Sequence, residues 1–157
     1  MKTVAGDLIT LALERQFDVI VHGCNCFCSM GAGIARTIQD EFPEAYAADL
    51  RTTKGDRNKL GTFSQATVMR DGHELTIVNG YTQFQFHGES VLTDYEAIRS
   101  VFAKIKDQFS GKRIGYPKIG AGLGGGDWTV IGRIIDEELA DEDHTLVIYQ
   151  PSDETPK

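Results

Sequence analysis

Two glycine-rich segments carry the residue pattern most able to do chemistry. The first contains Gly31 and Gly33, and the second runs from Gly120 to Gly126. Each lies between an apolar, strand-like run and a helix-like pattern. Backbone N–H groups at such a turn, together with the helix dipole, favour an anion. Because both turns follow strand ends, the pattern predicts a nucleotide-like site in which they grip a diphosphate from two sides.

The number of glycines favours a ligand-binding role for these segments over a role as turns alone. A tight turn alone would explain Gly31 and Gly33, but the second segment holds five glycines, each unfavourable by roughly 0.5–1 kcal/mol relative to alanine in an ordered element. Close approach of the backbone to a ligand accounts for that cost. No Gly-Lys-Ser or Gly-Lys-Thr follows either segment, which disfavours a magnesium-dependent NTPase. The first strand also lacks the glycine spacing of a dinucleotide-binding fingerprint.

Three polar side chains accompany the predicted strand ends. His22, at the end of an apolar run, is either a general acid/base, a phosphate donor or a hydrogen-bonded core histidine. Asn25 has an uncharged side chain able to bridge ribose hydroxyls. His87 follows another strand within an aromatic and polar loop, so it either reaches the site or is solvated at the surface.

Two carboxylates and one aromatic ring complete the candidates. Asp7 either accepts a hydrogen bond from an adenine amino group or caps the helix that follows. Asp127 stands at another helix start, where a cap is again the alternative. Tyr149 ends the last strand, where its ring could stack on a base.

The three cysteines, Cys24, Cys26 and Cys28, are crowded into five residues. Structural zinc prefers a second ligand pair elsewhere, and the four histidines are scattered, so we expect small half-buried thiols and no metal. A nucleophilic cysteine stays open, with His22 as its one obvious partner. An odd number of cysteines cannot form a disulfide framework, so we expect a reducing cytoplasm.

Length, composition and net charge limit the class of protein and its possible partners. The chain has 157 residues, 41% hydrophobic and 25% charged, as expected of one globular domain over residues 1–150 with a polar tail over 151–157. The net charge of −7 argues against broad nucleic-acid or anionic-membrane binding. The sequence shows neither a membrane-spanning run nor a signal peptide, and we expect a monomer.

Strand-like and helix-like patterns alternate along the chain, which predicts an α/β sandwich. The expected strands are 3–5, 17–22, 63–69, 75–81, 113–116 and 145–149. The expected helices are 8–14, 34–42, 45–50, 91–109 and 128–139. Asp71-Gly72 predicts a hairpin, so we expect a mixed, mostly parallel sheet.

Two ordered motifs carry a family resemblance. The segment His22-Gly-Cys-Asn-Cys-Phe-Cys-Ser-Met-Gly-Ala-Gly-Ile-Ala35 and the later Pro117-Lys-Ile-Gly-Ala-Gly-Leu-Gly-Gly-Gly-Asp-Trp128 resemble the macro domain family, which binds ADP-ribose. The resemblance extends from Gly6-Asp7-Leu8 to Val147-Ile-Tyr149 and is strongest to the yeast-type ADP-ribose-1″-phosphate phosphatase branch. It implies a three-layer α/β/α sandwich and ADP-ribose, or a derivative substituted at the 1″ position, as the ligand.

The resemblance also implies roles for matched positions. Asp7 would hold the adenine amino group, Leu8 would make a backbone contact beside it, Asn25 would bind the distal ribose, and Tyr149 would stack near the adenine. One phosphate loop would comprise Gly31, Gly33 and Ile34, and the other Gly120, Ala121, Gly122, Leu123 and Gly124. For the removal of a 1″-phosphate by an in-line water, without metal or cofactor, the candidate catalytic residues are His22, Asn25, His87 and Asp127.

Two other functions remain compatible with the resemblance: a non-catalytic ADP-ribose-binding module and a hydrolase of ADP-ribosyl or O-acyl-ADP-ribose bonds. A related branch that cleaves ADP-ribose from glutamate or DNA bases uses a lysine in the loop after the strand 77–81. Here that loop reads Thr82-Gln-Phe-Gln-Phe-His-Gly88, without lysine, and the acidic partner of that lysine has no clean counterpart. A covalent lysine mechanism is therefore disfavoured.

Overall fold

A six-stranded sheet forms the centre of the protein in the computed structural model, which describes residues 1–88 and 91–151. The strands lie in the order β1 (Lys2–Gly6), β6 (His144–Tyr149), β5 (Ile114–Tyr116), β2 (Val19–Cys24), β4 (His73–Tyr81) and β3 (Phe63–Arg70). All neighbouring pairs are parallel except β3 with β4. The predicted mixed, mostly parallel sheet is confirmed.

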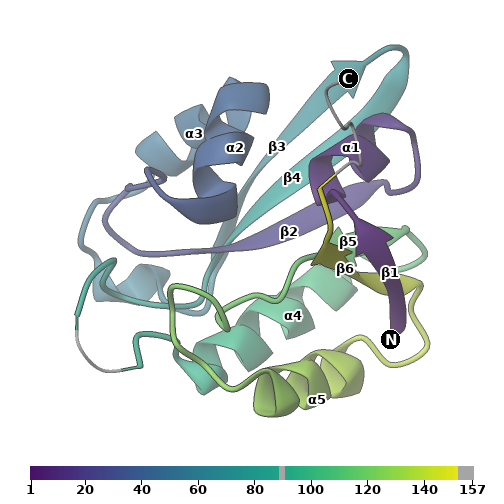
Figure 1. Cartoon of the computed structure of the whole chain (residues 1–157). Helices are drawn as coiled ribbons and strands as arrows, with labels where there is room; N and C mark the ends of the chain where they lie inside the picture. Colours follow the sequence, from purple (N-terminus) through teal and green to yellow (C-terminus); the bar gives the residue numbers. More distant parts are fainter. Residues whose placement is uncertain (89–90, 152–157) are drawn as a thin grey trace, which may run out of the picture.

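Helices cover both faces of this sheet (Figure 1). One layer consists of α1 (Leu8–Leu13), α2 (Gly33–Glu41) and α3 (Pro43–Leu50), and the other of α4 (Tyr95–Phe109) and α5 (Trp128–Glu138). Because successive strand residues point to opposite faces, Val19 and Val21 pack in the core under α4 and α5, while Ile20 packs in the core under α1 to α3. The three-layer sandwich is therefore confirmed. Within the described part of the chain, no helix combines the length and apolar character needed to cross a bilayer.

The hairpin between β3 and β4 turns where the sequence predicted. Asp71 and Gly72 have φ values of 50° and 77°, and Arg70 pairs with His73 directly beside them. Positive φ at both central residues is the type I′ geometry whose twist matches the flanking strands.

Several predicted element boundaries differ from the observed ones by two residues or more, and the largest difference is at the start of α4. The helix expected from Val91 begins only after Asp94, whose carboxylate accepts from the N–H of Ala97 at 3.0 Å. The N–H groups of Leu92 and Thr93 instead donate to Gly124 O. The strand expected over 17–22 is shifted to Val19–Cys24, and a 3₁₀ turn at Arg57–Lys59, η1, was not foreseen.

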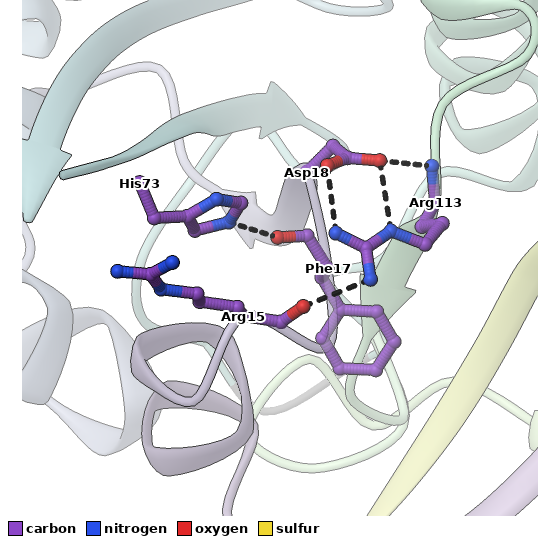
Figure 2. A network of polar contacts seen from close by, with 5 residues as sticks. All are labelled: Arg15, Phe17, Asp18, His73 and Arg113. Carbon is purple, nitrogen blue, oxygen red and sulfur yellow. Dashed lines mark hydrogen bonds and ion pairs between the residues drawn. The ribbon is translucent and has the colours of Figure 1, made fainter.

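An ion pair fastens the amino ends of β2 and β5 (Figure 2). Arg113 donates from its guanidinium to both oxygens of Asp18, at 2.9 and 3.1 Å, and from its backbone N–H at 2.9 Å. These bonds lower the pKa of the Asp18 carboxyl to about 2. Arg113 also donates to Arg15 O, and a ring nitrogen of His73 lies 2.9 Å from Phe17 O. This network lies at the sheet edge opposite the glycine-rich segments.

Candidate functional site

A cavity of about 460 Å³ opens at the carboxyl ends of β1, β5 and β6, beside α1 and α2. This is within the usual size range of small-molecule sites. Its lining consists of Asp7, Leu8, Ile9, Gly33, Ile34, Thr37, Pro117, Val147 and Tyr149. Five of the predicted site residues therefore come together here: Asp7, Leu8, Gly33, Ile34 and Tyr149.

One end of the cavity is built by neighbouring strand ends. Gly6 of β1 pairs with Tyr149 of β6, so Asp7 emerges beside the tyrosine. Asp7 Oδ1 accepts from the N–H groups of Ile9 and Thr10 at 2.9 and 3.0 Å, which caps α1. The helix-cap interpretation of Asp7 is confirmed, and the same residue is part of the cavity wall, so its contact with adenine stays a prediction. The Tyr149 side chain is 71% exposed, which leaves its ring open for stacking.

The N-terminus of α2 enters the same cavity. Gly33 begins this helix with a φ of 60°, in the left-handed region that glycine adopts readily. Ala32 occupies the N-cap position, where no side chain accepts from the first-turn N–H groups. The first turn of an α-helix leaves its N–H groups without intrahelical partners, so an anion here would meet several donors and the positive end of the helix dipole.

The second glycine-rich segment lies against the first. A Cβ built on Gly33 would be 3.5 Å from Leu123 Cδ1, and the Leu123 side chain is 76% exposed. Gly126 N donates to Gly120 O at 2.7 Å, which closes the segment into a loop. The N–H groups of Gly122, Leu123 and Gly124 donate to no acceptor among residues 1–88 and 91–151. Consecutive unpaired N–H groups of this kind form an anion-binding concavity.

The glycines of this loop serve packing as much as ligand access, which corrects the sequence interpretation. A Cβ on Gly124 would lie 2.3 Å from Thr93 Oγ1, and one on Gly120 or Gly126 would also be within 3 Å of neighbouring atoms. Thr93 Oγ1 in turn donates to Gly120 O at 2.8 Å. The loop therefore wraps closely around Thr93. Gly122 differs, since nothing lies within 4 Å of its added Cβ.

His22 is not at the end of a strand, so the predicted position is wrong. β2 continues to Cys24, and the His22 side chain is fully buried, with Nε2 2.7 Å from Asn79 Oδ1. Desolvation lowers its pKa from 6.5 to about 4, and the Asn79 bond offsets only part of that effect. The geometry is that of a hydrogen-bonded core histidine, outside the cavity lining.

The other three candidate catalytic residues also lie outside that lining. Asn25 holds its own loop: its side chain donates to Ser29 O and accepts from Phe27 N, both at 2.8 Å. His87 is exposed and packs edge-on against Phe86. Asp127 is the N-cap of α5, as its alternative reading anticipated, and its carboxylate accepts from the N–H of the residue two positions on.

Four cavity residues were not singled out from the sequence: Ile9, Thr37, Pro117 and Val147. Val147 is two residues before Tyr149 and so points to the same face of the strand. Thr37 is one helical turn after Gly33, and Pro117 directly follows the end of β5. The periodicities that located the elements would have found these neighbours.

The cysteines were also candidates for metal binding or nucleophilic chemistry. In the described ranges, no three His, Cys, Asp or Glu side chains lie together as a ligand set, and all three thiols are free. Burial raises the pKa of Cys24 well above its ordinary value, although its Sγ lies 3.5 Å from His22 Nε2. A thiol held in its neutral form is a poor nucleophile.

Comparison with known proteins shows the family and the fold of the chain. The family model of the macro domain matches residues 21–135. An uncharacterized 17.5 kDa protein of Enterobacteria phage T4 is 34% identical over 96% of this chain and 97% of its own length. An ADP-ribose 1″-phosphate phosphatase of Debaryomyces hansenii is 29% identical over 68% of this chain and 66% of its own.

Solved structures share the fold. The macrodomain of Mycobacterium tuberculosis DarG superposes with a TM-score of 0.73 at 21% identity, covering 96% of this chain and 97% of that one. Thermosipho africanus DarTG in complex with ADP-ribose has a TM-score of 0.69 at 17% identity, covering all of this chain and 43% of that one. Together with the family model, which matches well over half of the sequence, these findings show that the chain belongs to the macro domain family.

Proposed function

We propose that this protein binds ADP-ribose in the cavity beside α1 and α2, with the diphosphate extending from the cavity to the glycine loop, whose residues 120–126 are not part of the cavity lining. The observation that carries the proposal is that two segments with unpaired N–H groups, the first turn of α2 and Gly122 to Gly124, lie against each other where Leu123 approaches Gly33. A diphosphate between them would be held by main-chain donors, which do not depend on the net charge of −7. The Thermosipho neighbour of the same fold, solved with ADP-ribose, supports this choice of ligand.

The orientation follows from the side chains at the cavity's end. Asp7 Oδ1 is used by α1, and no described residue donates to its Oδ2, which can therefore accept from the amino group of adenine. The exposed ring of Tyr149 stands beside it to stack on the base. The diphosphate would then extend over Gly33 toward Leu123, and the distal ribose would approach the loop that carries Asn25.

Titration calorimetry with ADP-ribose on wild type and two variants tests this proposal. Asp7→Asn keeps an oxygen for the helix cap but presents an NH₂ donor to the adenine amino group, so affinity should fall at least tenfold, about 1.4 kcal/mol. Asp94→Asn is the matched control, because Asp94 caps α4 in the same way outside the cavity lining. Absence of ADP-ribose binding by the wild type, or equal affinity in the Asp7 variant, would refute the proposal.

A second function is favoured by the motif around Asn25. The resemblance to the yeast-type branch and the 29% identity to the Debaryomyces phosphatase support hydrolysis of the 1″-phosphomonoester of ADP-ribose-1″-phosphate. Of the four candidate catalytic residues, His22 is enclosed in the core, whereas Asn25 belongs to the loop that leads into α2, toward which the proposed orientation directs the distal ribose. Asn25 is therefore the first residue to test for orientation of the 1″ group.

The decisive measurement is release of inorganic phosphate from ADP-ribose-1″-phosphate. We expect release by the wild type and at least a tenfold lower rate in Asn25→Ala, while His87→Ala reports whether the exposed histidine contributes. Binding of ADP-ribose without any phosphate release would leave a binding module as the function. Loss of label from ADP-ribosylated protein or nucleic acid would instead indicate a hydrolase of ADP-ribosyl bonds.

A further inference from the structure

Lys59 is a buried lysine with no ion-pair partner among the described carboxylates. It is only 7% exposed, at the end of the 3₁₀ turn η1. Its Nζ donates to Cys26 O at 3.3 Å and stands 4.6 Å from the centre of the Tyr81 ring. A buried ammonium usually pairs with a carboxylate, so this environment sets Lys59 apart from the surface lysines.

The third neighbour of the Lys59 amine is a thiol. Nζ lies 3.7 Å from Cys28 Sγ, which also donates to Asp49 O at 3.4 Å and lies 3.6 Å from Thr52 Oγ1. These contacts fix the direction of the Cys28 side chain. The amine and the sulfur are already at contact distance, only slightly beyond the separation at which groups react.

Cys28 is also the cysteine most open to a small reagent. It is half-buried, whereas Cys24 and Cys26 are 5% and 0% exposed. Burial raises the pKa of both buried thiols and keeps them in the less reactive neutral form. A hydrophilic oxidant would therefore meet Cys28 first.

We propose that Cys28 and Lys59 are a site of oxidative modification, in which peroxide joins the two side chains by a sulfur–nitrogen bond. Peroxide first oxidises the thiol to a sulfenic acid and is itself reduced to water. The Lys59 ammonium first releases a proton to water; the amine nitrogen then attacks the sulfur, the S–O bond breaks, and the hydroxyl leaves as water with a second proton from the nitrogen. In sum, RSH, R′NH₂ and H₂O₂ give RS–NHR′ and two H₂O, and thiols reverse the reaction.

The bond would connect two segments that meet at the same place in the fold. Cys28 belongs to the loop that carries Asn25 and leads into α2, and Lys59 belongs to η1, near Gly55, whose N–H donates to Cys26 O at 2.7 Å. Because the segments already touch, the crosslink would fix this loop without unfolding the protein. The inference does not depend on ADP-ribose being the ligand.

Peptide mapping by mass spectrometry tests the proposal on the full-length protein. Reduced protein is exposed to hydrogen peroxide, remaining thiols are alkylated, and the tryptic digest is compared with an untreated sample. We expect the peptide containing Cys28 joined to the one containing Lys59, with a mass lower by two hydrogen atoms, no cleavage at Lys59, and reversal by dithiothreitol.

Two matched variants make the result specific. Lys59→Arg retains the positive charge but should form no crosslink, and its Cys28 should continue to sulfinic acid. Lys54→Arg changes an exposed lysine in the same segment and should crosslink as the wild type does. A disulfide among the three cysteines, sulfinic acid at Cys28 of the wild type without a crosslink, or an unmodified Cys28 would each overturn the proposal.

Discussion

Replacing Gly124 by alanine should destabilise the protein, whereas the same change at Gly122, two residues away, should not. An added Cβ at position 124 would lie 2.3 Å from Thr93 Oγ1 and 3.0 Å from Gly120 O. The first contact is far inside normal packing distances and the second is unusually tight, and Thr93 is itself buried and hydrogen-bonded to the loop. Forced displacement of this kind costs about 1–3 kcal/mol.

The expected result is measurable by thermal unfolding. A loss of about 2 kcal/mol corresponds to a Tm lower by about 4–8 °C for a chain of this size. Gly122→Ala meets no atom within 4 Å, so its free energy of unfolding should stay within about 0.5 kcal/mol of the wild type. In calorimetry, the same Gly122 variant should still lose affinity for ADP-ribose, because its methyl group would stand where the diphosphate approaches the N–H groups.

Comparing the two variants therefore distinguishes the effect of a glycine on packing from its effect on ligand binding. Gly124→Ala as stable as the wild type would refute the reasoning, since it would mean that the loop does not wrap tightly around Thr93. Equal destabilisation by both substitutions would refute it as well. Full ADP-ribose affinity in Gly122→Ala would remove the Gly122 N–H group from the proposed binding surface.

Two further predictions concern acid stability. The pKa of His22 is about 4 in the folded chain against 6.5 unfolded, so the unfolded chain binds the proton first and stability should fall by about 3 kcal/mol between pH 6.5 and pH 4. Denaturant unfolding should show a smaller fall in His22→Gln, and an identical fall would contradict the assignment. Arg113 lowers the pKa of Asp18 from 3.8 to about 2. The ion pair therefore stabilises the folded protein above about pH 4, and this contribution is lost as the pH falls through 2. Because the pair is partly exposed, Asp18→Asn should cost about 1 kcal/mol at pH 7 and nothing below pH 2, and a difference that persists there would exclude the ion pair as its source.

Local patterns were sufficient for most of the fold. The run around Ile20 identified a buried strand, and Asp71-Gly72 located the hairpin because positive φ at two adjacent positions demands such residues. Pro43 marked the boundary between α2 and α3, where it occupies the first turn of α3. Each of these signals depends on residues that are neighbours in the chain, so it can be recognised in a single sequence.

The parts that sequence reasoning missed depend on partners distant in the chain. His22 could be assigned to the core only with knowledge of Asn79, 57 residues away. The glycine loop could be understood only with Thr93, which also moves the start of α4 from Val91 to Tyr95 by engaging Gly124. A motif therefore located the candidate site, but it could not distinguish the residues that build the site from those that would contact a ligand.

The wrapping of the glycine loop around Thr93 has a consequence for the kinetics of recognition. Glycine-rich segments ordinarily sample many conformations. A ligand that orders such a segment binds more weakly, because the conformational entropy lost by the segment opposes binding. In this protein the bonds that Gly126 N–H and Thr93 Oγ1 donate to Gly120 O already close the loop, so less of that entropic penalty is left for the binding step. We therefore expect the association rate constant for ADP-ribose to be close to the diffusion limit. Differences in affinity between ligands should then lie mainly in the dissociation rate constant.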